Sequence, residues 1–292
     1  MMKDKSQARK ISELIELTKR YFAGRAVENP RLDAEMLLCH ILGKDRVYLY
    51  VHFDQPLEEA EINAYRKLVR RRAGGEPVAY ITGRKNFMGM EFAVSPDVLI
   101  PRPETEFLAE AAIKYCRGKK ARFLDIGTGS GALALSILQN CPDACAVGLD
   151  ISAAALEMAK MNAEKFSLAG RIEFINSDVR NFFDQAGGKK FDLIVSNPPY
   201  IPGGEISALA LEVQKEPPLA LDGGPDGLYF YRLILGRGKT LLAPGGSVFL
   251  EIGSTQAAAV SDIALQAGFK DCVVLKDYAG LDRTALISGG GL

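Results

Sequence analysis

The stretch that decides the fold is residues 121–150, which read ARFLDIGTGSGALALSILQNCPDACAVGLD. The apolar run over 121–126 predicts a buried strand, and three alternating glycines follow it directly. Apolar positions then predict a helix over 130–139 and a second buried strand over 145–150. Strand, glycine-rich turn, helix and strand in this order predict a βαβ unit, from which parallel sheets are built.

The alternation of strands and helices extends over most of the chain on both sides of this unit. Helices are predicted over 105–116, 152–168, 227–242 and 255–267, and further strands over 171–175, 191–196, 246–252, 271–276 and 283–288. This order predicts an α/β fold with a doubly wound, mostly parallel sheet.

The N-terminal part of the chain lacks this alternation. Over residues 8–72 apolar positions recur at helical spacing, which predicts a small helical bundle that ends in the basic run Arg70–Arg72. Residues 76–99 are β-formers interrupted by glycine, which predict a connecting hairpin. We therefore expect a helical domain over 1–75, a β-hairpin linker over 76–99 and a sheet domain over 100–292.

The charge of the chain restricts its function. The 292 residues include 36 basic and 36 acidic side chains, so the formal net charge is zero. Proteins that coat nucleic acid depend on an excess of positive charge, and that class is disfavoured. The charge is uneven, however, because residues 1–85 hold 17 basic and 12 acidic side chains. A docking surface for an acidic macromolecule and ordinary solvated faces both explain this asymmetry.

Chemistry that needs several imidazoles is disfavoured, because His40 and His52 are the only histidines. The five cysteines are scattered, and the closest pair, Cys141 and Cys145, has no neighbouring ligands to complete a zinc site. We expect reduced thiols and no metal. No apolar run reaches the length of a membrane span, and the N-terminus has no apolar signal-peptide core. These features predict a cytoplasmic protein.

The turn after the first strand is the first candidate site. Glycines let a ligand approach the backbone, and this GxGxG spacing differs from the GxGxxG of dinucleotide sites. An acidic residue just ahead of the turn favours a nucleoside ligand that carries no pyrophosphate. A purely structural strand-to-helix turn is the alternative for the glycines alone. The residues expected to hold the ligand are Asp125, Gly127, Thr128, Gly129, Ser130 and Gly131.

Carboxylates follow the next two strands. Asp150 ends the strand over 145–150, where a carboxylate can bind a ribose diol. Asp178 follows the third strand and can accept a hydrogen bond from an adenine amino group, while Val179 borders the ring. Ligands of open α/β sheets lie beyond the carboxyl ends of the strands, where these elements converge. Either aspartate alone is also a good helix N-cap.

The second candidate site is Asn197-Pro198-Pro199-Tyr200, which follows the strand over 191–196. Two prolines make a stiff turn. The Asn197 amide oxygen and the Pro198 carbonyl can accept both hydrogens of one planar NH2 group, and Tyr200 offers a ring on which that group stacks. Such a turn aims a nitrogen at an electrophile without a general base. We expect Asn197, Pro198 and Tyr200 to be catalytic.

Together the two loops resemble those of class I S-adenosylmethionine-dependent methyltransferases that act on NH2 groups. Asn-Pro-Pro-Tyr is shared by DNA adenine methyltransferases and protein glutamine methyltransferases. Further segments are similar to the peptide chain release factor glutamine methyltransferases (the PrmC/HemK family), and the resemblance covers essentially the whole chain. They are PVAYITG at 77–83, FAV at 92–94, VLIPRPETE at 98–106, EP at 216–217 with ALDGG at 220–224 and DGL at 226–228, and KDYAGLDR at 276–283. One difference is Val179, where relatives often carry an aromatic residue.

The resemblance implies a Rossmann-like class I methyltransferase sheet, seven-stranded and mostly parallel, with the small helical bundle joined to it by the β-hairpin. It implies methyl transfer from S-adenosylmethionine, with S-adenosylhomocysteine as product and no metal. The acceptor is the side-chain amide nitrogen of the glutamine in the GGQ motif of class 1 release factors, so the reaction modulates translation termination. Besides Asp125 and Gly127–Gly131, the implied cofactor-binding residues are Asp150, Asp178, Val179 and Asn197. The implied substrate-binding residues are Arg102, Pro103, Glu104, Asn197, Pro198, Pro199 and Tyr200.

Release factors are therefore the expected partners. The helical bundle is their expected docking surface, and Arg70–Arg72 are expected to contribute charge to it. For Arg102, a structural ion pair is as good an explanation as a substrate contact. We expect a monomer with neither a membrane nor a nucleic-acid substrate. The alternatives are a ribosomal-protein glutamine methyltransferase, a DNA adenine methyltransferase and a docking module without activity. Zero net charge opposes the DNA enzyme, and the coexistence of both motifs opposes the inactive module.

Overall fold

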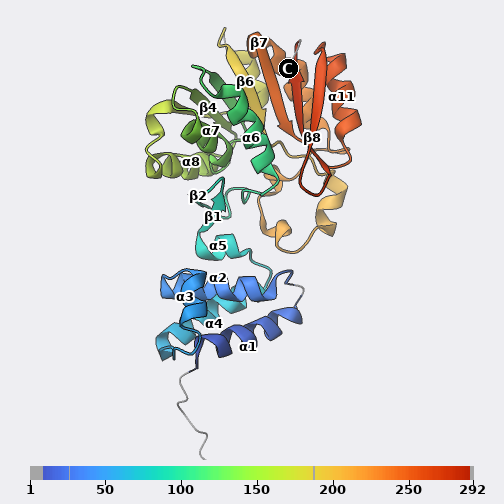
Figure 1. The fold of residues 1–292 in the computed structure, drawn as a ribbon. Helices are drawn as coiled ribbons and strands as arrows, with labels where there is room; N and C mark the ends of the chain where they lie inside the picture. Colours follow the sequence, from blue (N-terminus) through green and yellow to red (C-terminus); the bar gives the residue numbers. More distant parts are fainter. Residues whose placement is uncertain (1–8, 26, 187, 290–292) are drawn as a thin grey trace, which may run out of the picture. The chain divides into compact units, whose positions relative to one another are not determined.

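The computed structural model describes residues 9–25, 27–186 and 188–289 (Figure 1). They divide into two compact units. The helical unit contains the described residues up to Gly83 together with Ala210–Lys215, and the sheet unit contains Arg84–Leu209 and the described residues from Glu216 onward. In the part of the chain that the structure describes, no helix combines the length and apolar composition needed to cross a bilayer.

The helical unit packs around apolar side chains spaced one helical turn apart. Ile11, Leu14, Phe22 and Leu38 are buried there, and Tyr65 donates a hydrogen bond from its hydroxyl to the Ala34 carbonyl (3.1 Å). Short α3 and α5 were not expected from the sequence, and α5 occupies the first part of the predicted hairpin linker. The helices are α1 (Ile11–Ala23), α2 (Pro30–Leu42), α3 (Arg46–Val51), α4 (Glu59–Ala73) and α5 (Val78–Thr82).

The expectation of an exposed basic face at Arg70–Arg72 is wrong for Arg72. Its side chain is only 6% exposed and forms ion pairs with Asp33 (2.6 Å) and Glu212 (2.8 Å). Glu212 lies in the Ala210–Lys215 segment of the same unit. A buried guanidinium with two carboxylate partners holds the unit together and is not available for docking, whereas Arg70 and Arg71 are exposed.

The sheet unit contains the predicted hairpin and a seven-stranded sheet. The hairpin pairs β1 (Arg84–Phe87) with antiparallel β2 (Met90–Ala93). The order of the large sheet is β5-β4-β3-β6-β7-β9-β8, and β9 alone runs against its neighbours. The predicted fold class, a mostly parallel sheet of seven strands, is confirmed. Its strands are β3 (Arg122–Ile126), β4 (Cys145–Asp150), β5 (Ile172–Asn176), β6 (Phe191–Ser196), β7 (Leu242–Glu251), β8 (Asp271–Lys276) and β9 (Asp282–Ser288).

Helices cover both faces of this sheet (Figure 1). Neighbouring residues of β3 show why, since Phe123 packs in the cluster of α6–α8 and Leu124 in the cluster of α9–α11. Buried on both faces, the central strands are mostly apolar, as parallel strands usually are. The helices are α6 (Thr105–Cys116), α7 (Ala132–Asn140), α8 (Ala153–Lys165), α9 (Val179–Gln185), α10 (Tyr229–Gly238) and α11 (Ala257–Gln266).

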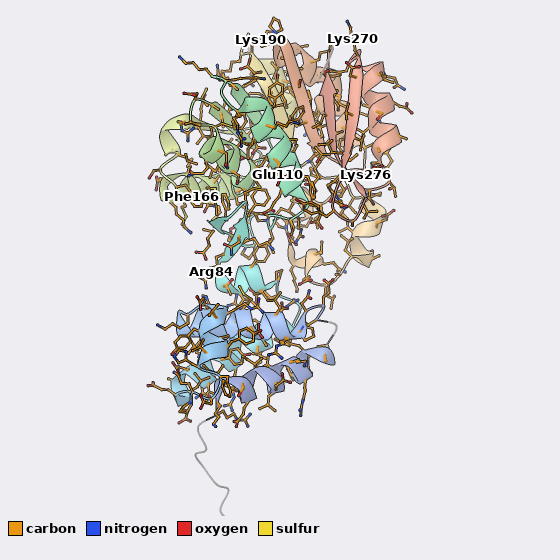
Figure 2. All side chains as sticks on the ribbon, in the orientation of Figure 1. Arg84, Glu110, Phe166, Lys190, Lys270 and Lys276 are labelled. Carbon is orange, nitrogen blue, oxygen red and sulfur yellow. The ribbon has the colours of Figure 1, made fainter. Side chains whose placement is uncertain are left out.

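All strands of the large sheet except β9 have their carboxyl ends at one edge of the sheet, and the candidate site depends on that edge. Figure 2 shows Lys190 and Lys270, which precede β6 and β8, at the amino edge, and Lys276, which ends β8, toward the opposite edge. Strand β3 pairs with β4 on one side and β6 on the other, so the strand order reverses at β3. Ligands of doubly wound sheets bind beyond the carboxyl ends at such a point.

Candidate active site

The glycine loop between β3 and α7 separates into two kinds of position. Gly127, Gly129 and Gly131 all adopt left-handed φ values (+73°, +55° and +78°). A Cβ added at Gly127 or Gly129 would meet nothing within 4 Å, so both face open space that a ligand can enter. A Cβ on Gly131 would lie 3.0 Å from Leu135 and 3.3 Å from Ala159. Gly131 is therefore required by helix packing.

Asp125, near the end of β3, holds this loop by a hydrogen bond. Its side chain is 1% exposed and accepts a hydrogen bond from the Thr128 hydroxyl (2.7 Å), and burial raises its pKa to about 7. The backbone N–H groups of Gly127 and Thr128 both donate to the Leu149 carbonyl (2.8 and 3.0 Å). Buried Ser130 accepts at its carbonyl from the Asn162 amide (2.9 Å). These bonds fix the loop, and Asp125 contributes as an anchor.

Asp150 lies where the sequence predicts it, beside the glycine loop. Its Oδ2 accepts from the Gly129 N–H (2.8 Å) and its Oδ1 from the Ser152 N–H (2.9 Å). Burial raises its pKa above the ordinary aspartate value. Because each carboxylate oxygen can accept more than one hydrogen bond, both retain capacity for a diol.

Asp178 has the N-cap role that the sequence left open. It accepts from the Arg180 N–H (2.8 Å) and pairs with the Arg180 guanidinium, which lowers the pKa of Asp178. The Asp150 carbonyl accepts from the Ser177 N–H (3.1 Å), so the tips of β4 and β5 are adjacent. Val179 packs against the apolar cluster of α9–α11.

The turn after β6 is held from outside its own sequence. The Asn197 side-chain Nδ2 donates to the Thr105 hydroxyl (3.1 Å), so its Oδ1 is the atom left to accept. Pro198 is buried and Pro199 half-buried. The Tyr200 hydroxyl donates to Glu251 Oε1 (3.4 Å), and burial, with Glu251 nearby, raises the pKa of Tyr200 to about 12.

Sequence reasoning missed the residues that hold this turn. Glu251 is 1% exposed at the end of β7 and accepts from the Thr105 hydroxyl at Oε2 (2.6 Å). Gln256 donates from Nε2 to the Tyr200 carbonyl (3.0 Å). A carboxylate at the end of an otherwise apolar strand is unusual, and that position was the available sequence indication for Glu251.

Arg102 lies just before Thr105 in the sequence and forms the structural ion pair considered above. Its guanidinium pairs with Glu216, whose side chain is buried and whose Oε2 also accepts from the Ile100 N–H (3.0 Å). The ion pair fixes the segment that leads into α6. Since about a third of the Arg102 side chain stays exposed, a substrate contact remains sterically open.

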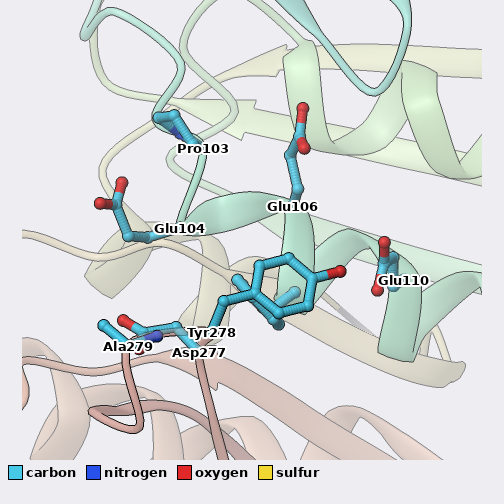
Figure 3. A pocket seen from close by; sticks show the side chains of 8 residues that line it. Pro103, Glu104, Glu106, Glu110, Asp277, Tyr278 and Ala279 are labelled. Carbon is cyan, nitrogen blue, oxygen red and sulfur yellow. Dashed lines mark hydrogen bonds between the residues drawn. The ribbon is translucent and has the colours of Figure 1, made fainter.

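Pro103 and Glu104 line a cavity of about 230 Å³ at the start of α6 (Figure 3). Tyr278, from the β8–β9 loop, is 93% exposed and tilts its ring against Phe107 (4.7 Å between centroids). The other residues that line the cavity are Glu106, Glu110, Asp277 and Ala279. Four carboxyl groups therefore surround an exposed aromatic ring. Within the described ranges, no three His, Cys, Asp or Glu side chains are grouped so as to hold a metal ion.

Comparison with known proteins gives the class to which this fold and site belong. The model of the PrmC N-terminal domain matches residues 13–83, and the model of the methyltransferase small domain matches residues 103–224. Similar folds occur in the hMettl16 catalytic domain in complex with MAT2A 3′UTR hairpin 1 (TM-score 0.60, 13% identity, 94% of this chain and 91% of that chain). A methyltransferase from Pyrococcus furiosus is also similar (TM-score 0.51, 20% identity, 77% and 96%). The chain is a methyltransferase.

Full-length relatives narrow this class. A release factor glutamine methyltransferase from Geobacter sulfurreducens is 44% identical over 283 residues, which are 97% of this chain and 98% of the relative. The one from Moorella thermoacetica is 43% identical over 91% of this chain and 94% of its own length. The chain belongs to the release factor glutamine methyltransferase family. The expected family and enzyme class are thereby confirmed.

Proposed function

We propose that this protein transfers the methyl group of S-adenosylmethionine to the side-chain amide nitrogen of the glutamine in the GGQ motif of class 1 release factors. The observation that carries the proposal is the turn at Asn197, where the Thr105 hydroxyl takes the Nδ2 hydrogen bond and leaves Oδ1 as an acceptor. Relatives that match along almost the whole chain favour this substrate over a ribosomal protein or DNA adenine.

The residues that hold the cofactor are those around the glycine loop. Gly127 and Gly129 leave open space where a Cβ would otherwise project, and Asp150 borders it with unused acceptor capacity. Asp178 and Val179 follow the neighbouring strand tip, on the adenine side of the proposed site. When bound, S-adenosylmethionine supplies an already activated methyl group on a sulfonium.

The turn at Asn197 orients the acceptor nitrogen. Asn197 Oδ1 and the Pro198 carbonyl accept the two amide hydrogens of the substrate glutamine, and the Tyr200 ring supports its plane. An amide nitrogen is a poor nucleophile because its lone pair is delocalised, so alignment must supply much of the acceleration. No side chain has to act as a base of high pKa before the nitrogen attacks.

The helical unit and the segment at Arg102–Glu104 are the proposed contacts for the release factor. Of the basic run Arg70–Arg72, Arg70 and Arg71 are exposed and are the charges that we propose for docking, although Arg71 also pairs with Glu76. Because translation termination takes place in the cytoplasm, we place the enzyme there, and we expect it to act as a monomer.

The test is methyl transfer from labelled cofactor to a purified class 1 release factor. We expect one labelled residue, the GGQ glutamine, and none after that glutamine is replaced by alanine. Asn197→Ala should abolish turnover while the Kd for the cofactor stays within a few-fold. A ribosomal-protein mixture and an adenine-containing duplex serve as competing substrates. Tight cofactor binding without label on the release factor would refute the substrate assignment.

A further inference from the structure

A chain of hydrogen bonds links both ends of the Asn197–Tyr200 turn to one buried carboxyl group. The Asn197 Nδ2 donates to Thr105 Oγ1 (3.1 Å), and Thr105 Oγ1 donates to Glu251 Oε2 (2.6 Å). The Tyr200 hydroxyl donates to Glu251 Oε1 (3.4 Å). Glu251 is 1% exposed, so the side chains around it, and not bulk water, provide its hydrogen bonds.

The direction of this chain follows from the donors available. An ionised carboxylate only accepts, and a threonine hydroxyl has a single proton. Once Thr105 donates that proton to Glu251, its oxygen can only accept from Asn197. The Asn197 amide must then present its nitrogen to Thr105 and turn its oxygen away from it. With a neutral group at position 251, the Thr105 proton is free to point at Asn197 Oδ1, which favours the opposite amide orientation.

Resting on the proposed function, we infer that Glu251 is a positioning residue that sets the amide orientation of Asn197 through Thr105 and holds the Tyr200 hydroxyl. The correct orientation presents an acceptor to the substrate NH2 group. The reversed orientation presents the Asn197 NH2 group instead, and two donors would then face each other. The carboxylate thus determines whether the turn recognises an amide nitrogen.

The segment that follows Glu251 holds the backbone of the same turn. Gln256 donates from Nε2 to the Tyr200 carbonyl (3.0 Å), and its Oε1 accepts from the Gly253 N–H (3.0 Å) and the Tyr231 hydroxyl (3.2 Å). Residues 251–256 therefore fix both a side-chain end and a main-chain end of the turn. The pairing of β7 in the sheet requires neither the hydrogen bonds of Glu251 nor those of Gln256 to the turn.

Charged and titratable groups from four other elements face Glu251. Arg283 of β9 stabilises its charge, whereas Glu104 ahead of α6 opposes it. Tyr200 follows β6, and Tyr231 of α10 is also near, since its pKa is raised by burial and then by the charges of Tyr200 and Glu251. Burial is the largest effect and raises the pKa of Glu251 to about 7. We expect kcat to rise as the pH increases through about 7, because ionised Glu251 is the form that orients Asn197.

The experiment compares matched variants with the release factor as substrate. In Glu251→Gln the new Nε2 can donate to Thr105, which releases the Thr105 proton toward Asn197. We expect a loss in kcat of about 100-fold, because small misplacements of reacting groups cost that much. The cofactor Kd should stay within about threefold, and the rise of kcat near pH 7 should disappear. Thr105→Val should lose a similar factor, and Thr105→Ser should rescue most of it by restoring the hydroxyl.

Thr284→Val is the control for a Thr→Val change in the same neighbourhood. Thr284 pairs with Glu251 in the β7–β9 register, and its buried hydroxyl has no hydrogen-bond partner in the described structure. We expect this variant to keep kcat within twofold. If Glu251→Gln fails to fold, the comparison of Thr105→Val with Thr105→Ser still tests the inference. A Glu251→Gln kcat within threefold of wild type, or a Thr105→Ser variant as impaired as Thr105→Val, would overturn the inference.

A substrate-free readout separates this inference from the proposed function. The side-chain NH2 signal of Asn197, identified in nitrogen NMR by its absence in Asn197→Ala, should titrate near pH 7 in wild type and not in Glu251→Gln. If the release factor is not methylated but this titration holds, the substrate is wrong and the positioning role stands. If the Asn197 signal is the same in wild type and Glu251→Gln at pH 8, where Glu251 is ionised, the positioning role is wrong.

Discussion

Gly223→Ala is predicted to displace the Asn197–Tyr200 turn without touching any proposed substrate atom. A Cβ at Gly223 would lie 2.7 Å from Tyr200 Cα, 2.8 Å from Tyr200 C and 2.9 Å from Gly227 Cα. All three are main-chain atoms, so no flexible side chain can move aside. Gly223 is also tied to the turn by its N–H, which donates to the Ile201 carbonyl (2.8 Å).

The size of the effect follows from these distances. Carbon atoms pack about 3.5–4.0 Å apart, so Gly223 and Tyr200 must separate by roughly 0.8 Å, of which about half falls on Tyr200 if both sides yield. Overpacking of this kind costs about 1–3 kcal/mol of stability. For a unit of this size, the melting temperature should fall by roughly 2–12 °C. A 1 Å misplacement costs about 100-fold in rate, so a shift of half that size should lower kcat by about tenfold.

The assay measures kcat on the release factor, cofactor Kd by calorimetry and melting temperature. Gly236→Ala is the matched control, because a Cβ on this glycine of α10 would meet nothing within 4 Å. Alanine in place of a helical glycine adds about 0.5–1 kcal/mol of stability, so the control should be slightly more stable and fully active. The reasoning fails if Gly223→Ala loses stability yet keeps the kcat of Gly236→Ala.

Three further predictions concern the cofactor loop and the helical unit. In Asp125→Asn the melting temperature relative to wild type should increase from pH 4 to pH 7. The pKa of Asp125 in the folded protein is raised to about 7, so the contribution of Asp125 to wild-type stability falls as the pH rises over that range, and the variant lacks this loss. A difference in melting temperature between variant and wild type that is the same at all pH values would contradict this. Asp150→Asn should raise the cofactor Kd at least about tenfold in calorimetry, since it removes a charged acceptor, and an unchanged Kd would exclude Asp150 from the cofactor site. Arg72→Met should cost about 3–5 kcal/mol in denaturant unfolding by leaving Asp33 buried without its partner, whereas exposed Arg70→Met should change stability by less than about 0.5 kcal/mol; equal effects of the two would show that the buried ion pair carries no stability.

The parts of the fold that the sequence predicts best are long, buried and bounded by turn residues. The ranges 145–150, 191–196 and 271–276 were predicted as strands with the bounds that β4, β6 and β8 have. Helices α3, α5 and α9 were missed, because segments of five to seven residues carry too little periodicity and are stabilised by tertiary contacts. The position of β9 between β7 and β8 depends on pairing and not on any local pattern.

The candidate site divides in the same way. The residues of the glycine loop and of Asn197–Tyr200 could be predicted from the sequence, because each set is contiguous and a few residues indicate its chemistry. Thr105 and Glu251 could not, since they are 146 positions apart and become related only by folding. Arg72 was misjudged for the same reason, because its partner Asp33 lies 39 positions away. Local sequence indicates which groups could react, and long-range packing decides how they are held.

The reversed strand β9 gives the buried carboxylate its counter-charge. Because β9 is antiparallel to β7, its first residues lie at the carboxyl end of β7, where the Arg283 carbonyl accepts from the Ile252 N–H (2.9 Å). If β9 were parallel to β7, the last residues of β9, and not Arg283, would lie at the carboxyl end of β7. Arg283 opposes the effect of burial on Glu251, so the carboxyl group can ionise near neutral pH. Since both histidines lie in the helical unit, the sheet unit has no imidazole for proton transfer at that pH. The charge of Glu251 then acts by orienting the Asn197 amide through Thr105, and methyl transfer to an amide nitrogen depends on such orientation.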